Sequence, residues 1–346
     1  MLQVKTGSQK PTKETTLHIY ILVLSIILCF QSLTAFAEKS TLIKNVKTCF
    51  SGPFETHGNW GNFLESKKKN FNKELFNKTF TKQRFNTIKA SLVCNNFRYE
   101  VDGYIVEGYY LKPRNASNKK LPVVIYNRGG NAGFGYVAFG QKLQLISDIA
   151  LKGFVVIGSQ YRGSSSRSIS NNGHDEFGGT DINDVLKLIE IAKDIPDADT
   201  DNLGMVGWSR GVMQSYIASQ SIPSLKTIVA IAGNSDVEKA LVWRPSMENV
   251  YKARVPNFDE NRSTELKSRS VSMWLDKIPT KMSILLIHGD KDKRVNVEQS
   301  KSLASQLKGR NHPHKLVIYP NDNHGLVKHR KEMTQEIISW LKTSLI

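Results

Sequence analysis

Residues 207–211, Gly-Trp-Ser-Arg-Gly, have the spacing of a turn that presents a serine as a nucleophile. A strand-length apolar run, residues 203–206, precedes this turn, and residues 212–220 after it have helical spacing. A serine between a strand and a helix adopts a strained backbone conformation, which small glycine neighbours make room for. The pattern therefore predicts Ser209 as the nucleophile of an acyl-transfer reaction.

A serine hydroxyl becomes an effective nucleophile when a histidine takes its proton and a carboxylate orients that histidine. After a turn of this kind the acid and then the base follow along the chain, each at the end of a strand. His324 follows the apolar run 315–319, and Asp292 follows the run 283–288. We predict His324 as the base and Asp292 as the acid. Asp290 is the alternative acid, and His288 is expected to pack beneath the site.

An oxyanion hole needs two donors aimed at the developing negative charge. The backbone amide of Arg210 is the first predicted donor, because it directly follows the nucleophile. The second is the amide of Gly129, in the glycine-rich segment 127–131 after the apolar run 123–126. A glycine turn without a catalytic part is the alternative for Gly129.

Three further residues are predicted to contact the substrate, namely Arg128, Trp208 and Tyr161. Arg128 could meet an anionic substrate group or brace its loop against a carboxylate, and we favour the brace. Near the same site, Arg162 is expected to form a buried ion pair with Asp175 or Glu176.

The carboxylates and the histidine in the two loops after residues 288 and 319 are better explained by a triad than by a metal site. We therefore predict neither a metal nor a cofactor.

Six apolar runs of strand length are separated by glycine-bearing turns and helical patterns. Their continuous apolarity predicts central strands covered on both faces, hence an α/β fold with a mostly parallel sheet. An alternating pair of strands around residues 102–103 predicts a hairpin before them. The interval 233–282 is long enough for a small helical cap. The six runs are 123–126, 154–158, 203–206, 227–232, 283–288 and 315–319.

The N-terminal residues 1–37 predict a cleaved export signal. Three lysines precede an apolar run at residues 17–30, and Ala-Phe-Ala follows at 35–37. An uncleaved anchor is the alternative. After the signal, residues 38–95 predict a basic extension of one or two amphipathic helices. Its cysteines, Cys49 and Cys94, could form a disulfide or remain separate thiols.

The chain has 346 residues, with 48 Lys and Arg against 31 Asp and Glu, a formal net charge of +17. Counted by segment, residues 1–37 carry +2, residues 38–100 carry +7 and residues 101–346 carry +8. The excess per residue is thus highest in the extension, which suggests weak association with anionic envelope surfaces. The sequence contains no nucleic-acid recognition motif, so we predict no nucleic-acid partner.

From about Phe97 to the C-terminus the chain resembles the catalytic domain of the prolyl oligopeptidase family. The members of this family are serine hydrolases with the α/β-hydrolase fold. The resemblance implies the same nucleophile, acid and base as above. The resemblance does not imply a substrate class. In this family a β-propeller selects short peptides, and the roughly 60 residues before this domain are too few to form one. Arg128 also stands where the family usually has His or Tyr. The motifs that carry the resemblance are 101–103, 108–113, 161–164, 176–181, 206–211, 288–295 and 323–325.

Three functions remain open from the sequence. The first is an exported, periplasmic or secreted, serine peptidase that cleaves short peptides through an acyl-enzyme. The second is a carboxylesterase or deacylase that uses the same triad on small esters. The third is a non-catalytic envelope protein that binds anionic surfaces. The sequence does not predict an oligomeric state.

Overall fold

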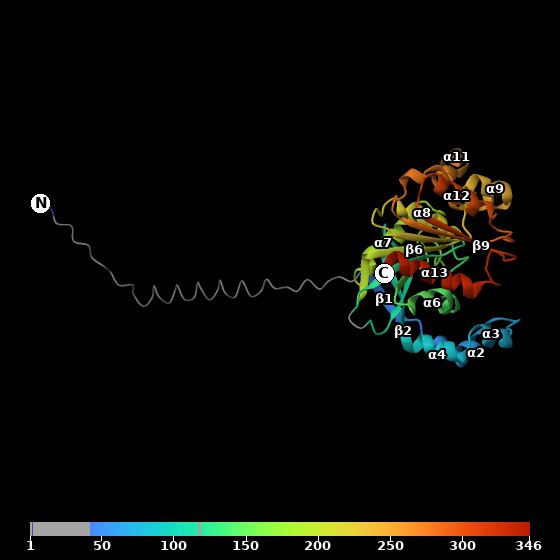
Figure 1. Ribbon diagram of the computed structural model, residues 1–346. Helices are drawn as coiled ribbons and strands as arrows, with labels where there is room; N and C mark the ends of the chain where they lie inside the picture. The colour runs from blue at the N-terminus through green and yellow to red at the C-terminus, as the bar shows by residue number, and fades with distance from the viewer. Residues whose placement is uncertain (1, 3–41, 117–118) are drawn as a thin grey trace. The chain divides into compact units, whose positions relative to one another are not determined.

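A nine-stranded sheet runs through the computed structural model, which describes residues 2, 42–116 and 119–346 (Figure 1). The strand order is β1-β2-β3-β5-β4-β6-β7-β8-β9. The strands from β5 onward along this order pair in parallel, whereas β1, β2, β3 and β5 pair antiparallel. The strands are β1 (Ile43–Thr48), β2 (Leu92–Val101), β3 (Tyr104–Pro113), β4 (Leu121–Asn127), β5 (Val155–Ser159), β6 (Ala198–Trp208), β7 (Thr227–Ile231), β8 (Ser283–Gly289) and β9 (His314–Tyr319).

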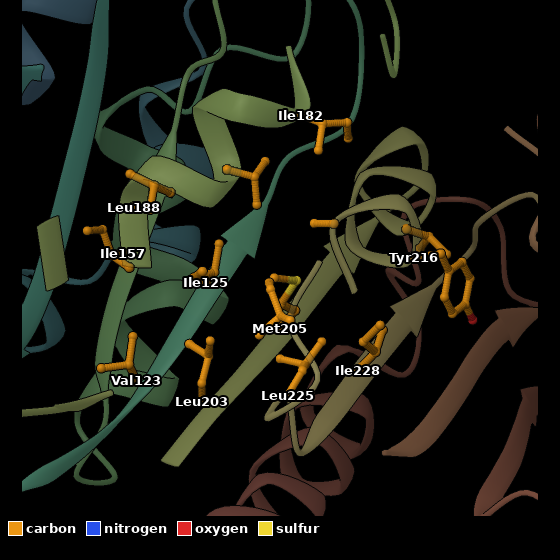
Figure 2. Packing of buried hydrophobic residues seen from close by; sticks show 14 of the residues in the cluster. Val123, Ile125, Ile157, Ile182, Leu188, Leu203, Met205, Tyr216, Leu225 and Ile228 are labelled. Carbon is orange, nitrogen blue, oxygen red and sulfur yellow. The ribbon is translucent and has the colours of Figure 1, made fainter. Parts of the chain in front are cut away.

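The sheet is mostly parallel and buried on both faces, as the continuous apolar runs predicted. Successive residues of a strand point to opposite faces, so a run without polar gaps supplies both cores. In β4, for example, Val123 and Ile125 join one core cluster, and Val124 joins the other. Figure 2 shows the first cluster, where Ile125, Met205 and Ile228 come from neighbouring strands.

Helices cover the sheet in two layers. On one face lie α7 (Ile182–Ala192), α8 (Arg210–Ser219) and α12 (Glu298–Gly309), whose apolar residues join the first cluster. On the other face lie α6 (Ser147–Ala150) and α13 (Arg330–Leu345), whose apolar residues join the second. Before α6 the chain forms two short turns, α5 (Phe139–Gln141) and η2 (Lys142–Ile146). This three-layer arrangement confirms the α/β class.

The predicted hairpin joins β2 to β3 through Asp102 and Gly103. Both residues have positive φ, 51° and 78°, which is the backbone of a two-residue turn matched to strand twist. The sequence pattern did not predict β1, which pairs with the outer edge of β2. Five of the six residues of β1 are exposed, so its sequence has no apolar alternation to reveal a strand.

Three helices stand between β1 and β2, where the sequence predicted one or two. They are α2 (His57–Lys67), α3 (Lys73–Thr79) and α4 (Lys82–Ser91), after a short 3-10 turn η1 (Gly52–Phe54). Each of the three begins at a side-chain cap, Thr56, Asn72 or Thr81, which ends the preceding segment and starts a new helix.

Aromatic packing and a disulfide hold these helices to the rest of the protein. The Trp60 ring lies 4.9 Å from both the Phe76 and the Phe139 rings, in edge-to-face contacts. Cys49 and Cys94 form a disulfide with a Cα–Cα distance of 5.4 Å. Of the two alternatives left by the sequence, the structure therefore has the disulfide. The predicted signal segment, residues 1–37, lies outside the described residues apart from Leu2.

Residues 233–282 form a group of short helices, which we call the cap. Its helices share a small core with Phe177 and with Met213 of α8. In Figure 1 α9 and α11 lie on the opposite side of the molecule from α2, α3 and α4. The cap consists of α9 (Val237–Trp243), η3 (Pro245–Met247), α10 (Glu248–Arg254), α11 (Phe258–Ser268), η4 (Val271–Met273) and η5 (Leu275–Lys277).

Across the part of the chain that the structure describes, no helix combines the length and apolarity that crossing a membrane requires.

Candidate active site

The predicted triad residues follow three strands that lie close together in the sheet. Ser209 follows β6, Asp292 follows β8 and His324 follows β9, and only β7 separates β6 from β8. Because these strands are parallel, their carboxyl ends meet at one edge of the sheet. Gly129 follows β4, which pairs with β6 on the other side. The topology thus gathers the four residues at one edge.

The backbone at Ser209 is strained, with φ 56° and ψ −119° between β6 and α8. Its two glycine neighbours allow this turn to pack tightly. A Cβ on Gly207 would lie 2.5 Å from the Gly211 carbonyl oxygen, and a Cβ on Gly211 would overlap the Asn127 carbonyl group. Both glycines are therefore required by close packing, as the pattern predicted.

His324 and Asp292 are joined by a hydrogen bond of 2.7 Å between Nδ1 and Oδ2. The other carboxylate oxygen of Asp292 accepts the backbone N–H groups of Arg294 and Val295, at 2.7 and 3.0 Å. Burial alone would raise the pKa of this carboxyl, but hydrogen bonds from His288, His324 and the Val295 amide lower it far below its usual range. Asp292 is thus an anion that fixes the His324 ring, whereas Asp290 is exposed.

His288 also contacts the Asp292 carboxylate, a contact that the sequence analysis did not predict. The ring is fully buried beneath the site, as predicted, with Nε2 3.2 Å from Asp292 Oδ2 and 3.1 Å from the Val295 carbonyl oxygen. Its Nδ1 lies 2.8 Å from the Ser300 hydroxyl. His288 therefore helps to position the carboxylate that holds His324.

The two predicted oxyanion donors lie beside Ser209. A Cβ on Gly129 would lie 3.1 Å from the Ser209 Cβ, so the backbone of this loop passes directly over the serine. Arg210 is the first residue of α8, and the first amides of a helix have no partner within it. Both backbones can approach an oxygen on a carbon bonded to Ser209, and the helix N-terminus favours negative charge there.

Arg128 braces its own loop, through carbonyl oxygens rather than the carboxylate that the sequence analysis expected. The guanidinium donates to the carbonyl oxygens of Gln160, Gly129 and Ala132, at 2.9, 2.9 and 2.8 Å. Burial, together with the nearby charge of Arg210, lowers the pKa of Arg128 to about 10. These bonds hold the loop that carries Gly129.

Tyr161 does not line the site, although we predicted it to contact substrate. Its ring is fully buried and packs against both guanidinium groups, 4.8 Å from that of Arg128 and 5.0 Å from that of Arg210. Tyr161 therefore packs against the side chains of two residues near Ser209.

The Arg210 side chain forms the buried ionic centre of the site. Its guanidinium donates to both oxygens of Asp175 at 2.7 Å and to Asp181, and none of the three side chains is more than 2% exposed. Burial opposes the charge of Arg210 and Asp175, but their mutual attraction outweighs it, raising the pKa of Arg210 and lowering that of Asp175. Asp175 also accepts the Ala132 amide, which ties the Gly129 loop to Arg210.

The prediction that Arg162 forms an ion pair with Asp175 or Glu176 was wrong. Arg162 instead pairs with Asp184 and with Asp102, both at 2.7 Å. The Asp175 carboxylate already pairs with Arg210, and the Arg162 guanidinium donates instead to Asp184 in α7 and to Asp102 in the β2–β3 turn. The sequence shows opposite charges in this region but not which of them pair.

A pocket of about 500 Å³ opens over Ser209. His324, Gly129, Arg128, Arg210 and Trp208 line it, so the structure brings these predicted residues to one cavity. Asp292 and Tyr161 are buried and do not line it. Three more arginines, which were not predicted from the sequence, also line the pocket: Arg244, Arg294 and Arg330. Arg294 had a signal in the sequence, since it lies two residues after Asp292, whereas Arg244 in the cap had none.

The sequence pattern that defines the prolyl oligopeptidase family matches residues 138–345. Uncharacterized peptidase YtmA of Bacillus subtilis is 25% identical over 263 residues, which are 75% of this chain and 98% of that protein. Dipeptidyl-peptidase 5 of Porphyromonas gingivalis is also 25% identical, over 65% of this chain but only 34% of its own length.

Among solved structures, the acylaminoacyl peptidase of Pyrococcus horikoshii superposes with a TM-score of 0.62 at 20% identity. The superposition covers 75% of this chain and 43% of that one. This chain thus spans nearly the whole of YtmA but less than half of the other two proteins.

Replacing Arg210 by methionine should destabilise the fold strongly, because Asp175 and Asp181 would be left buried without their cation. We expect a loss of about 3–5 kcal/mol in the free energy of unfolding, measured by urea denaturation. Adding Asp175→Asn to this variant should recover part of the loss. As a matched control, Lys301→Met removes the exposed pair with Glu298 and should change little. An Arg210→Met protein as stable as the wild type would contradict this account.

Proposed function

Since this chain belongs to the prolyl oligopeptidase family of serine hydrolases, we propose that it cleaves peptides through an acyl-enzyme formed on Ser209. The observation that carries the proposal is the hydrogen bond between Asp292 and His324, two residues that follow strands near the strained turn of Ser209. The pocket over Ser209 supplies space for a substrate.

In the proposed reaction Ser209 Oγ attacks the carbonyl carbon of the scissile bond while His324 Nε2 takes the hydroxyl proton. Asp292 holds the opposite ring nitrogen and stabilises the imidazolium that forms. The amides of Arg210 and Gly129 donate to the oxyanion. His324 then gives its proton to the leaving amine, and the C–N bond breaks. Water, deprotonated by His324, releases the acid and restores the serine.

We favour peptides over esters because the relatives that match over most of the catalytic region carry the name peptidase. Their substrates do not transfer with the name, since this chain covers about a third of the dipeptidyl peptidase. The proposal is therefore limited to bond type.

We further propose that the protein is exported. Two observations support this, the signal-like pattern of residues 1–37 and the disulfide between Cys49 and Cys94. Disulfides of this kind persist in oxidising compartments and are rare in a reducing cytosol.

Replacing Ser209 by alanine should abolish turnover while leaving the fold intact, because alanine removes only the attacking oxygen. On N-acetylated aminoacyl arylamides we expect kcat/KM to fall at least about 10⁴-fold. Ser246→Ala is the matched control, since Ser246 is exposed in the cap and does not line the pocket. Short-chain aryl esters should be tested in parallel, and a preference for esters above about a hundredfold would favour the esterase alternative. Equal activity of Ser209→Ala and wild type would refute the proposal.

N-terminal sequencing of the protein recovered from its host should give a mature chain that begins near Glu38, because the small residues Ala35 and Ala37 suit the processing enzyme. A chain that keeps residues 1–37 and is found with the cytosolic fraction would contradict export.

A further inference from the structure

The wall of the pocket over Ser209 carries an unbalanced positive charge. Five arginines line it, and no Asp or Glu does among the residues that the structure describes. The remaining wall is mostly apolar, with aromatic, aliphatic and thioether side chains. The five arginines are Arg128, Arg210, Arg244, Arg294 and Arg330.

Three of these arginines have structural partners. Arg210 is neutralised by Asp175 and Asp181, as described above. Arg128 and Arg330 are bonded only to carbonyl oxygens in the described part of the chain, and Arg330 donates to that of Gly325 at 2.6 Å. Carbonyl groups orient a guanidinium without cancelling its charge, so both still contribute a positive potential to the pocket.

Arg244 and Arg294 differ from the other three because their guanidinium groups are unoccupied. Both residues are exposed, and within residues 42–116 and 119–346 neither side chain has a hydrogen bond or an ion pair. They come from separate elements, since Arg244 directly follows α9 in the cap and Arg294 follows Asp292 after β8. Two free guanidinium groups from different elements therefore border one cavity that contains Ser209 and His324.

A guanidinium is matched in shape and charge to a carboxylate, with which it forms two parallel hydrogen bonds. Conversely, a free amino group would meet repulsion in a pocket with this charge and without a carboxylate to receive it. We propose that the site prefers peptides that carry a carboxylate near the scissile bond, held by Arg244 and Arg294. This inference rests on the proposed function and names its substrate class.

Two sources could supply that carboxylate, an acidic side chain or a free C-terminus. To test an acidic side chain, we would compare pairs of N-acetylated dipeptide arylamides in which one member has Glu and the other has Gln. In one pair this residue is next to the scissile bond, and in the other it is one residue before it. For the second, we would compare internally quenched peptides that end in a free acid or in an amide. To test repulsion of the amine, we would compare the Gln arylamide with an acetylated N-terminus to the same arylamide with a free N-terminus.

For wild-type protein we expect kcat/KM to be at least about tenfold higher for one carboxylate substrate than for its neutral partner. The preference should shrink as NaCl rises from about 50 to 500 mM, because exposed charges are screened. In Arg244→Gln and Arg294→Gln the preference should fall severalfold, and in the double variant it should approach unity. Arg310→Gln removes the same charge at the end of α12, away from the pocket, and should retain the wild-type preference.

The outcomes separate the two hypotheses. Turnover of both members of every pair at equal rates, or a preference for the free amine, would overturn the carboxylate preference and leave the peptidase proposal standing. A preference that survives in the double variant would overturn the role of the two arginines. Failure to cleave any member of the panel would count against the peptidase proposal itself and against the inference built on it.

Discussion

The arrangement of the site depends on one buried cation, the guanidinium of Arg210. Arg210 directly follows Ser209, so the partners that hold the Arg210 side chain also fix the start of α8 and the turn of Ser209. Asp175 holds it and at the same time accepts the Ala132 amide, which secures the loop that passes over Ser209. Phe177 lies 4.6 Å from the guanidinium and belongs to the core of the cap. The Ser209 turn, the loop that carries Gly129 and the cap are therefore joined through the Arg210 side chain.

The cost of burying this charge explains why so many partners surround it. An unpaired guanidinium in the interior would be strongly destabilising, and two carboxylates and two aromatic faces offset that cost here. A network of this kind would keep the proposed oxyanion donors, the amides of Arg210 and Gly129, in place before substrate arrives, as electrostatic catalysis requires. Arg244 and Arg294, which line the pocket, have no such partners in the described part of the chain, so their charges are available to a ligand.

Local patterns in the sequence predicted the buried strands and the turn of Ser209, but not the contacts between residues that are distant along the chain. The runs that became β4 to β9 were recognisable because central strands need apolar residues on both faces, and the glycines around Ser209 because the turn has no space for side chains. β1 escaped notice because an exposed edge strand needs no apolar alternation. The partners of Arg162 and Arg210 were not predictable, since several carboxylates lie within reach along the chain and only the fold decides between them.

The proposed reaction requires that Ser209 is the residue that becomes acylated. The most direct test is to treat the protein with a fluorophosphonate and locate the adduct by mass spectrometry after trypsin digestion. The phosphonyl group should be found on the peptide of residues 194–210, which contains Ser209 between cleavage sites at Lys193 and Arg210. An adduct on another serine, or an unmodified protein under conditions that label a control serine hydrolase, would contradict the claim.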